Sequence, residues 1–302
     1  MTGEKNNART ALFSAFVLVP VAALTIVLTS VLLSRTGLPF AAAYAVSVLA
    51  AVIGTCAASY GGKTLITLPS PAIISWLVYE EIIARGITWQ EMLGIAALVS
   101  LLGTVLTRTR YAATLLSVLP ATVRIGLVLG LGLTLLMTAA LHARILLPSP
   151  WVLTMGGTLS DPLTYFTFTG ILLVLVLWAR KLRCALPLGM ALIALLTWAE
   201  GFWEIPAAPF LAPDLISLPL VLTLPQSDFL LSLPLGMTLL LALVIESEAV
   251  LAAQTDAAKG TRPLARLFTV SGFAALIGAF PLTIAPISAA LPTEKETHGS
   301  AG

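Results

Sequence analysis

The sequence predicts an all-α polytopic membrane protein with about nine transmembrane segments and a partial tenth. The first observation is composition: 58% of the 302 residues are hydrophobic and only 10% are charged, whereas a soluble domain carries about 25% charged residues. The second is a series of apolar runs long enough to cross a bilayer. The third is one apolar stretch, residues 64–75, in which Pro69 and Pro71 forbid a continuous helix.

Each spanning segment is predicted from an apolar run of about 17–25 residues. The first run follows a polar N-terminus, residues 1–10, and is too long for the apolar region of a signal peptide. A Pro-rich connection over 204–228 separates the seventh run from the eighth, and a polar tail covers 292–302. In order, the runs are 11–33, 39–58, 64–79, 91–107, 121–141, 163–179, 184–203, 229–252, 266–280 and the short 281–291.

The charges in the loops orient these segments, because cytoplasmic loops of membrane proteins are enriched in Lys and Arg. If the N-terminus is cytoplasmic and every run crosses, only Arg35, Arg85 and Arg144 fall in outer loops. The acids that then fall on the outer side include Glu80, Glu81, Glu200, Glu204, Asp214 and Asp228. The basic residues of the inner loops are Lys5, Arg9, Lys63, Arg108, Arg110, Arg180, Lys181, Arg183, Lys259, Arg262 and Arg266.

The interrupted stretch has a counterpart late in the sequence. Leu65-Ile-Thr-Leu-Pro69 is similar to Leu282-Thr-Ile-Ala-Pro286, and each follows an Ala-Ala-Val-Ile-Gly or Ala-Ala-Leu-Ile-Gly run. Seven crossings separate the two copies, so we expect them to have opposite orientations in the membrane. Inverted repeats with broken helices at matching positions are typical of secondary transporters. Irregular backbone at membrane depth is tolerated only inside protein or beside a polar cavity.

Two acids, Glu246 and Glu248, lie inside a predicted span. If the helix begins near Pro234, Glu246 lies about 18 Å along it, past the midplane towards the cytoplasm. An ionised carboxylate there costs at least ~2.5–3.5 kcal/mol, so Glu246 must face a polar cavity or bind a proton. The two side chains diverge by about 200°, so one ligand cannot contact both. Alternatively, both acids belong to an interfacial helix end, with Asp256 and Lys259 just beyond.

Other classes of function have no support in the sequence. It contains no nucleophile elbow, phosphate-binding loop or zinc-ligand spacing. We therefore expect no enzyme activity, no metal site and no cofactor. The net charge of +2 is too small to indicate a nucleic-acid partner.

Six short motifs, three of them in loops or at the entry to a segment, follow one another in the order of a known family. The chain resembles the nucleobase–cation symporter-2 family (xanthine/uracil permeases), most closely its adenine/guanine/hypoxanthine permease branch, over about residues 10–290. The motifs are Gly54-Thr55, Pro69-Ser-Pro-Ala-Ile-Ile-Ser75, Gly86-Ile-Thr-Trp-Gln90, Ser117-Val-Leu-Pro-Ala-Thr-Val-Arg-Ile-Gly126, Gly157-Thr-Leu-Ser-Asp-Pro162 and Glu246-Ser-Glu-Ala-Val-Leu251.

The resemblance implies fourteen segments in two inverted halves of seven, divided into a core domain and a gate domain. Short antiparallel strands in segments three and ten would meet in the core, and the nucleobase would bind between these strands and Glu246. Glu246 would also couple transport to a proton. The implied domains are core segments 1–4 over residues 11–107, gate segments 5–7 over 111–203, the outer connection 204–228, and core segments 8–10, in part, over 229–291. The implied substrate contacts are Glu246, Ser70, Ala72, Thr283 and Ser288.

The sequence also departs from that branch. Leu243 stands where the branch has a second acid, Ala249 and Val250 replace a Gly and a Thr, and the chain ends after the partial tenth segment. Two functions therefore stay open. The first is a purine-type nucleobase permease, proton-coupled, in the cell's inner (cytoplasmic) membrane with its N-terminus in the cytoplasm. The alternative is a non-transporting, degenerate or partner-dependent permease-like protein. The expected partners are the lipid bilayer, a nucleobase, and either a second copy in a homodimer or a protein that supplies the missing segments.

Overall fold

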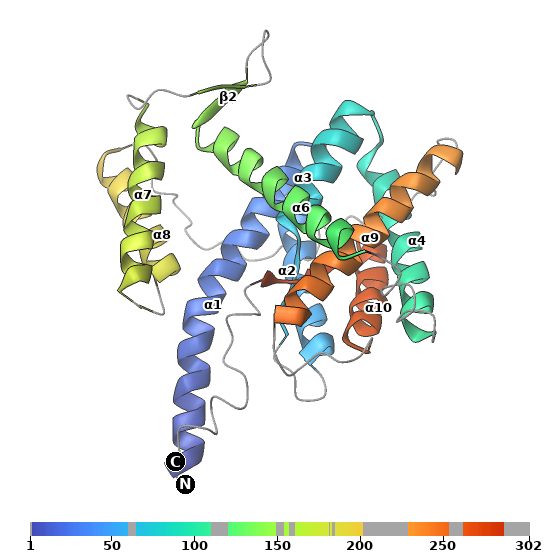
Figure 1. Ribbon diagram of the computed structural model, residues 1–302, viewed down its shortest axis with the longest axis horizontal. Coiled ribbons are helices and arrows are strands. Elements are labelled where there is room, and N and C mark those ends of the chain that lie inside the picture. The colour runs from blue at the N-terminus through green and yellow to red at the C-terminus, as the bar shows by residue number, and fades with distance from the viewer. Residues whose placement is uncertain are drawn as a thin grey trace. The chain divides into compact units, whose positions relative to one another are not determined.

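The computed structural model describes residues 2–59, 65–109, 120–148, 154–156, 161–180, 182, 185–201, 229–253 and 262–286. The predicted connection 204–228 and tail 292–302 lie outside this part. Figure 1 shows the elements, which in chain order are α1 (Thr2–Ser34), α2 (Phe40–Ser59), β1 (Thr67–Pro69), α3 (Pro71–Trp76), η1 (Leu77–Ala84), α4 (Trp89–Arg108), α6 (Ala121–His142), β2 (Leu146–Pro148), β3 (Thr154–Gly156), α7 (Pro162–Ala179), α8 (Ala185–Ala199), α9 (Phe229–Ala253), α10 (Arg262–Leu276) and β4 (Leu282–Ile284).

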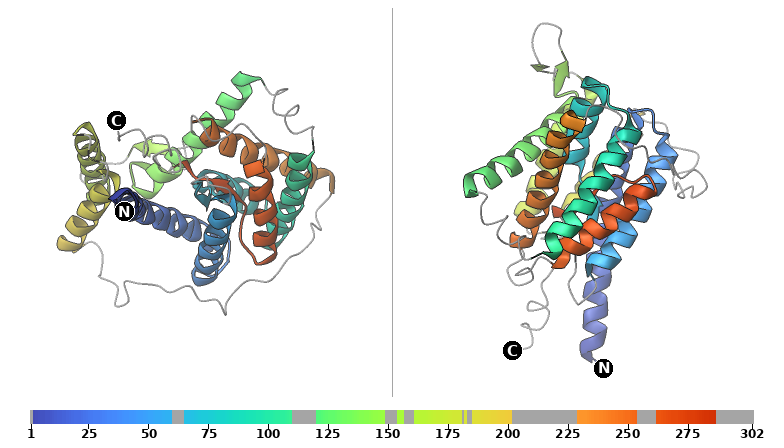
Figure 2. Two further views of the ribbon diagram at one scale, coloured as in Figure 1. Left: turned by 90° about the horizontal axis from the view of Figure 1, so that it is seen from below. Right: turned by 90° about the vertical axis from the view of Figure 1, so that its right-hand side faces the viewer.

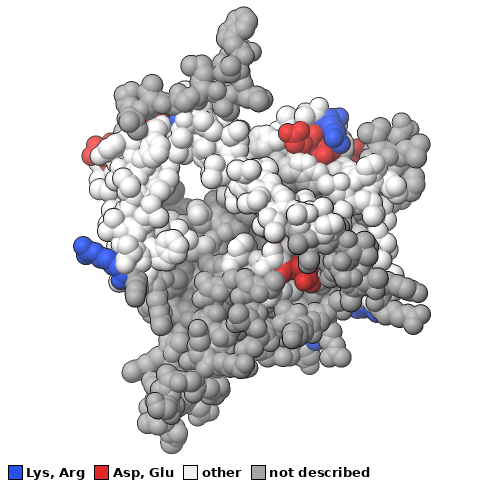
Figure 3. All heavy atoms as spheres, in the orientation of Figure 1, with Lys and Arg blue, Asp and Glu red and all other residues white. Residues whose placement is uncertain are grey.

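The helices confirm the all-α polytopic membrane fold. Among the described residues, five helices are long and apolar enough to cross a bilayer: Phe40–Ser59, Trp89–Arg108, Ile125–His142, Pro162–Ala179 and Ser232–Leu251. Shorter apolar helices cover Leu18–Ser34, Ala185–Ala199 and Pro263–Leu276. Figure 3 shows few charged atoms on the described surface of the face that it draws, as expected for helices in contact with lipid. The number of segments in the whole chain stays a prediction.

The third predicted segment extends further than the sequence indicates. After the strand β1, helix α3 continues without interruption into the π-helix η1, which ends at Ala84. Glu80 and Glu81 therefore lie in a helix that continues beyond residue 79, where the predicted span ends. The side of the membrane on which they lie stays a prediction. Apolar residues bury one side of this continuation, and Gly86 ends it in the left-handed conformation with φ 75°. The buried apolar residues are Leu77, Val78 and Ile82.

The chain divides into two compact units. One combines residues Met1–Ala23 with Leu133–Ala212, and the other combines Leu24–Gly132 with Pro213–Gly302. In the first unit, α7 packs against α8. The strands β2 and β3 of this unit pair antiparallel, with Leu146 opposite Gly156. This hairpin has no counterpart among the predicted elements. The predicted boundaries between core and gate segments stay a prediction.

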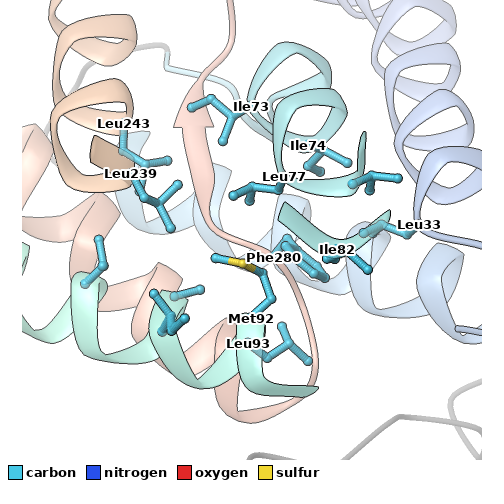
Figure 4. Packing of buried hydrophobic residues seen from close by; sticks show 14 of the residues in the cluster. Leu33, Ile73, Ile74, Leu77, Ile82, Met92, Leu93, Leu239, Leu243 and Phe280 are labelled. Carbon is cyan, nitrogen blue, oxygen red and sulfur yellow. The ribbon is translucent and has the colours of Figure 1, made fainter. Parts of the chain in front are cut away.

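The second unit is built around the strands β1 and β4. Helices α2, α9 and α10 contact β4, and α4 packs along α10 and α9, so these elements surround the strand pair in Figure 2. Gly103 allows the close approach of α4 to α10, because a Cβ there would lie within 2.7 Å of the Phe268 ring. Figure 4 shows part of the apolar core, in which Leu239 and Leu243 of α9 lie near Ile73 of α3.

Candidate functional site

Two short strands that are 215 positions apart in the sequence meet inside the second unit. Strand β1 pairs antiparallel with β4, with Thr67 opposite Ile284 and Pro69 opposite Leu282. Ala285 N–H also donates to Ile66 O at 2.8 Å, which extends the pairing by one bond. The predicted meeting of antiparallel strands from segments three and ten is thereby confirmed.

The outer edge of each strand is completed by a hydroxyl from the helix that precedes it. Thr55 Oγ1 of α2 accepts a hydrogen bond from Thr67 N–H at 3.1 Å. Ser271 Oγ of α10 accepts one from Leu282 N–H at 3.1 Å. A two-stranded ribbon leaves two open edges, and no water satisfies such edges in the interior of a membrane protein. The helix hydroxyls therefore make strand pairing compatible with burial.

Helix α9 supplies a third hydroxyl of this kind. Ser247 Oγ accepts from Ile284 N–H at 3.4 Å, and the Ser247 side chain is fully buried. Neither Ser247 nor Ser271 is among the predicted site residues, because a serine within an apolar helix carries no signal for the strand that it contacts. The only available hint was position, since Ser247 directly follows Glu246.

Gly54 sets how closely α2 approaches the strand pair. A Cβ on Gly54 would overlap Thr67 Oγ1 and would lie 2.6 Å from Leu282 Cδ1. Side chains on a strand alternate between its two faces, so Thr67 and Leu282, which lie on the same face, both point towards α2. The glycine of the Gly54-Thr55 motif thus has a packing role, and Thr55 has the edge-pairing role.

Ser70 links the end of β1 to helix α9. Its backbone is extended, with φ −73° and ψ 120°, and its hydroxyl caps α3 by accepting from Ile73 N–H at 3.3 Å. Pro71 follows at the first helical position, where a missing N–H costs nothing. The same Ser70 hydroxyl donates its proton to Glu246 Oε1 at 2.8 Å. The Pro-Ser-Pro sequence therefore builds a strand end, a helix start and a contact to the acid.

The Glu246 carboxyl group lies beside both strands. The hydroxyl of Thr283 in β4 is next to this carboxyl group and also makes a long bond of 3.5 Å to Leu68 O. Glu246 Oε2 is buried and has no well-formed hydrogen bond to any of the described residues. Ser70 and Thr283 are 3% and 1% exposed. One acceptor oxygen of Glu246 is thus held by protein, and the other is left for a donor.

The structure brings three of the five predicted site residues together: Ser70, Thr283 and Glu246. Ala72 is buried in the first turn of α3, and Ser288 lies outside the described residues. Leu243, one helical turn before Glu246, is 1% exposed and packs in the apolar cluster with Ile73. One flank of the acid is therefore apolar, at the position where the resembling branch has a second carboxylate.

This arrangement is suited to a ligand that donates hydrogen bonds. A carboxylate accepts hydrogen bonds only, and bonds from N–H groups to a charged acceptor are about twice as strong as neutral ones. The described residues contain no group of three or more His, Cys, Asp or Glu side chains that could hold a metal ion. The site offers an acceptor oxygen and an apolar flank, and the hydroxyls of Ser70 and Thr283 adjoin the carboxyl group.

The fold is that of a transporter membrane domain. It is similar to the transmembrane domain of the cyanobacterial bicarbonate transporter BicA, with a TM-score of 0.60 and 18% sequence identity, covering 97% of this chain and 78% of that chain. At this identity the similarity shows the fold alone. The protein is therefore a multi-pass membrane protein with the architecture of a transporter.

Sequence comparison adds two distant relatives. The chain is 24% identical over 194 residues to the guanine/hypoxanthine permease PbuO of Bacillus subtilis, covering 61% of this chain and 45% of the relative. It is 25% identical over 213 residues to a Methanocaldococcus jannaschii protein named "Putative permease MJ0326", covering 70% of this chain and 48% of the relative. No protein-family model matches the chain.

Both matches are to proteins named as permeases, one of them a guanine/hypoxanthine permease, and they confirm the resemblance found in the sequence motifs. It spans about half the length of the curated relatives that it matches. Those relatives are named as permeases, which are transporters and not enzymes.

Proposed function

We propose that this protein is a permease for purine-type nucleobases and that Glu246 is its proton-linked substrate ligand. The observation that supports it most directly is the position of the Glu246 carboxyl group beside the paired strands β1 and β4. Ser70 donates a hydrogen bond to one carboxyl oxygen. The other oxygen is buried and has no well-formed hydrogen bond to the described residues. The name of the Bacillus subtilis relative suggests guanine and hypoxanthine as the first solutes to test.

The chemistry of purine bases fits this site. Their ring and exocyclic N–H groups are donors, and Glu246 Oε2 is an acceptor that has no well-formed hydrogen bond to the described residues, although the Thr283 hydroxyl is nearby. Leu243 and Ile73 give the planar ring an apolar neighbourhood, which favours a neutral heterocycle over a charged solute. Binding a proton would cancel the charge of Glu246 during the transport cycle, which lowers the cost of moving the carboxyl group within the membrane.

The proposal includes a location and an assembly. The protein would lie in the cytoplasmic membrane with its N-terminus inside the cell, in accord with the excess of Lys and Arg in the predicted inner loops. No cofactor is needed beyond the coupling ion. The proposed partners are the lipid bilayer, a nucleobase and either a second copy in a homodimer or a further membrane protein.

Uptake measurements test this function. The full chain is expressed in a host that lacks its own purine-base permeases, and uptake of radiolabelled hypoxanthine and guanine is compared with that of the empty vector. We expect the wild type to accumulate label, more at pH 6 than at pH 8, and a protonophore to abolish the accumulation. Glu246→Gln should reduce uptake about tenfold or more, because it removes a charge-assisted acceptor.

Glu248→Gln is the matched control, because Glu248 lies two residues further along the same helix and points away from Glu246. It should retain most of the uptake. Immunoblots of membrane fractions establish equal expression and insertion. Wild-type protein that is inserted in the membrane but moves no purine or pyrimidine would contradict the proposal.

A second candidate, a permease-like protein that does not transport alone, is favoured by Leu243. This residue places an apolar side chain where the resembling branch has an acid. Under this hypothesis the isolated chain in proteoliposomes moves no nucleobase, and uptake appears only when a defined full-length permease is present. Uptake by the isolated chain would exclude this candidate.

A further inference from the structure

We infer that Ser70 is a positioning residue that orients Glu246 for its ligand and ties the state of that carboxyl group to the start of helix α3. This inference rests on the proposed role of Glu246 as the substrate ligand. In this role Ser70 acts on the substrate through Glu246, and it does not need to contact the substrate itself.

The hydrogen-bonding capacity of Ser70 leads to this assignment. A serine hydroxyl has one proton to donate and two lone pairs that accept. In this structure the proton goes to Glu246 Oε1 at 2.8 Å, and one lone pair accepts from Ile73 N–H at 3.3 Å. Ser70 is 3% exposed, so water has little access to replace either partner. The donor that Ser70 offers is therefore already committed to Glu246.

The contact fixes the orientation of the acid. A glutamate side chain has several rotatable bonds, and a bond from Ser70 to Oε1 restricts them while Oε2 stays without a well-formed partner among the described residues. A ligand that donates to Oε2 then meets an acceptor already in place, which saves the cost of ordering it. The neighbouring residue reinforces this position, because Ser247 holds the backbone of β4.

The contact also couples two elements. Ser70 is both the N-cap of α3 and the donor to α9. When Glu246 gains a proton on Oε1, that oxygen becomes a poorer acceptor, and the Ser70 hydroxyl loses the partner that fixes its rotamer. The cap on Ile73 N–H depends on the same rotamer. A change at the carboxyl group therefore reaches the start of α3 through one side chain.

Chemical labelling tests the contact without requiring transport. Dicyclohexylcarbodiimide reacts with protonated carboxyl groups in apolar surroundings, and mass spectrometry locates the modified residue. Ser70→Ala removes the donor that favours charged Glu246, so we expect labelling of Glu246 at pH 7 to rise several-fold. Ser70→Thr keeps the hydroxyl and an acceptable cap, so its labelling should match the wild type. Glu246→Gln identifies the labelled residue.

Two controls separate positioning from general damage. Ser75→Ala deletes another buried hydroxyl of α3, one that donates to Pro71 O. Thr88→Ala deletes the N-cap of a different helix, α4, which accepts from Glu91 N–H. Neither hydroxyl is bonded to Glu246 in this structure, so neither substitution should change labelling at that residue.

Binding of radiolabelled hypoxanthine to membranes that contain the full chain provides the second measurement. Ser70→Ala should weaken binding about tenfold, the scale of a lost hydrogen bond to a charged group, whereas Ser70→Thr, Ser75→Ala and Thr88→Ala stay near the wild type. In a Glu246→Gln background, Ser70→Ala should cause little further loss, since residues that act through one another are not additive.

The outcomes separate this inference from the proposed function. Unchanged labelling in Ser70→Ala, or labelling that rises equally in Ser75→Ala, overturns the positioning role even if the protein transports purines. A rise confined to Ser70→Ala supports that role even if the wild type binds no hypoxanthine, a result that would count against the proposed substrate alone.

Discussion

Glu81 is a buried carboxyl group in the π-helix η1. Its side chain is 3% exposed and pairs with Arg85 at 2.9 Å, one helical turn further on. Burial raises the pKa of Glu81 above its ordinary value of 4.5, and the Arg85 guanidinium, itself 57% exposed, opposes this shift. Glu81 lies in η1, which is not among the five described helices that are long and apolar enough to cross a bilayer.

The raised pKa of Glu81 predicts how stability depends on pH. The folded protein binds this proton more readily than the unfolded chain, so the contribution of Glu81 is fully present below pH 4.5, the ordinary value of its pKa, and is lost as pH rises through the folded pKa. We expect the midpoint of thermal unfolding in detergent, measured relative to Glu81→Gln, to fall between pH 4.5 and pH 7.5. Glu80→Gln is the control, because Glu80 is exposed. A relative midpoint that rises with pH would contradict this prediction.

The crossing of α2 with the strand pair depends on the absence of a side chain at Gly54. A methyl group there would overlap Thr67 Oγ1 and crowd Leu282, and overpacking of a buried site typically costs about 1–3 kcal/mol. Gly54→Ala should therefore lower the thermal midpoint by several degrees and also weaken hypoxanthine binding, because the displaced strands carry Thr283 and adjoin Ser70.

Gly132→Ala provides the comparison for that substitution. Gly132 lies within α6 and is exposed, and a Cβ added there would meet no atom within 4 Å. Replacing an exposed helical glycine by alanine usually stabilises a helix by about 0.5–1 kcal/mol. We therefore expect the thermal midpoint to fall in Gly54→Ala and to rise in Gly132→Ala. Equal changes in the two variants would contradict the packing role of Gly54.

The sequence predicted the two strands but not the side-chain hydrogen bonds that stabilise them. Pro69 and Pro71 mark the break, and the similarity of 65–69 to 282–286 indicates its counterpart. The pairing of β1 with β4 follows the family pattern. The hydroxyls of Ser247 and Ser271 escape prediction because their partners are backbone groups more than ten residues away. The hairpin of β2 with β3 gives only three-residue strands, which are too short for a periodic signal.

The candidate site is predictable to a similar extent. Glu246 stands out because a carboxyl group within an apolar run is costly. Pro69 and Pro71 interrupt the third segment and so indicate that Ser70 lies in irregular backbone. Their 2.8 Å contact joins residues 176 positions apart, a distance that no local pattern spans. Composition and charge define the class of the whole molecule, whereas contacts of this range require the fold.

The charges in the loops predict how the whole molecule is oriented in the membrane. Arg35, Arg108 and Arg180 are exposed at the ends of α1, α4 and α7. With the N-terminus in the cytoplasm, Arg35 lies outside, and Arg108 and Arg180 both lie inside, since two crossings separate them. Cysteine labelling can test each position, because the chain contains only two native cysteines, Cys56 and Cys184.

The test uses Arg35→Cys, Arg108→Cys and Arg180→Cys, each in a background in which both native cysteines are serine. A membrane-impermeant maleimide applied to intact cells should label Arg35→Cys alone, and all three variants should react after permeabilisation. A reversed pattern would contradict the cytoplasmic N-terminus. Labelling of Arg108→Cys and Arg180→Cys from opposite sides would contradict the number of crossings between them, because an odd number of spans would then have to lie between α4 and the end of α7.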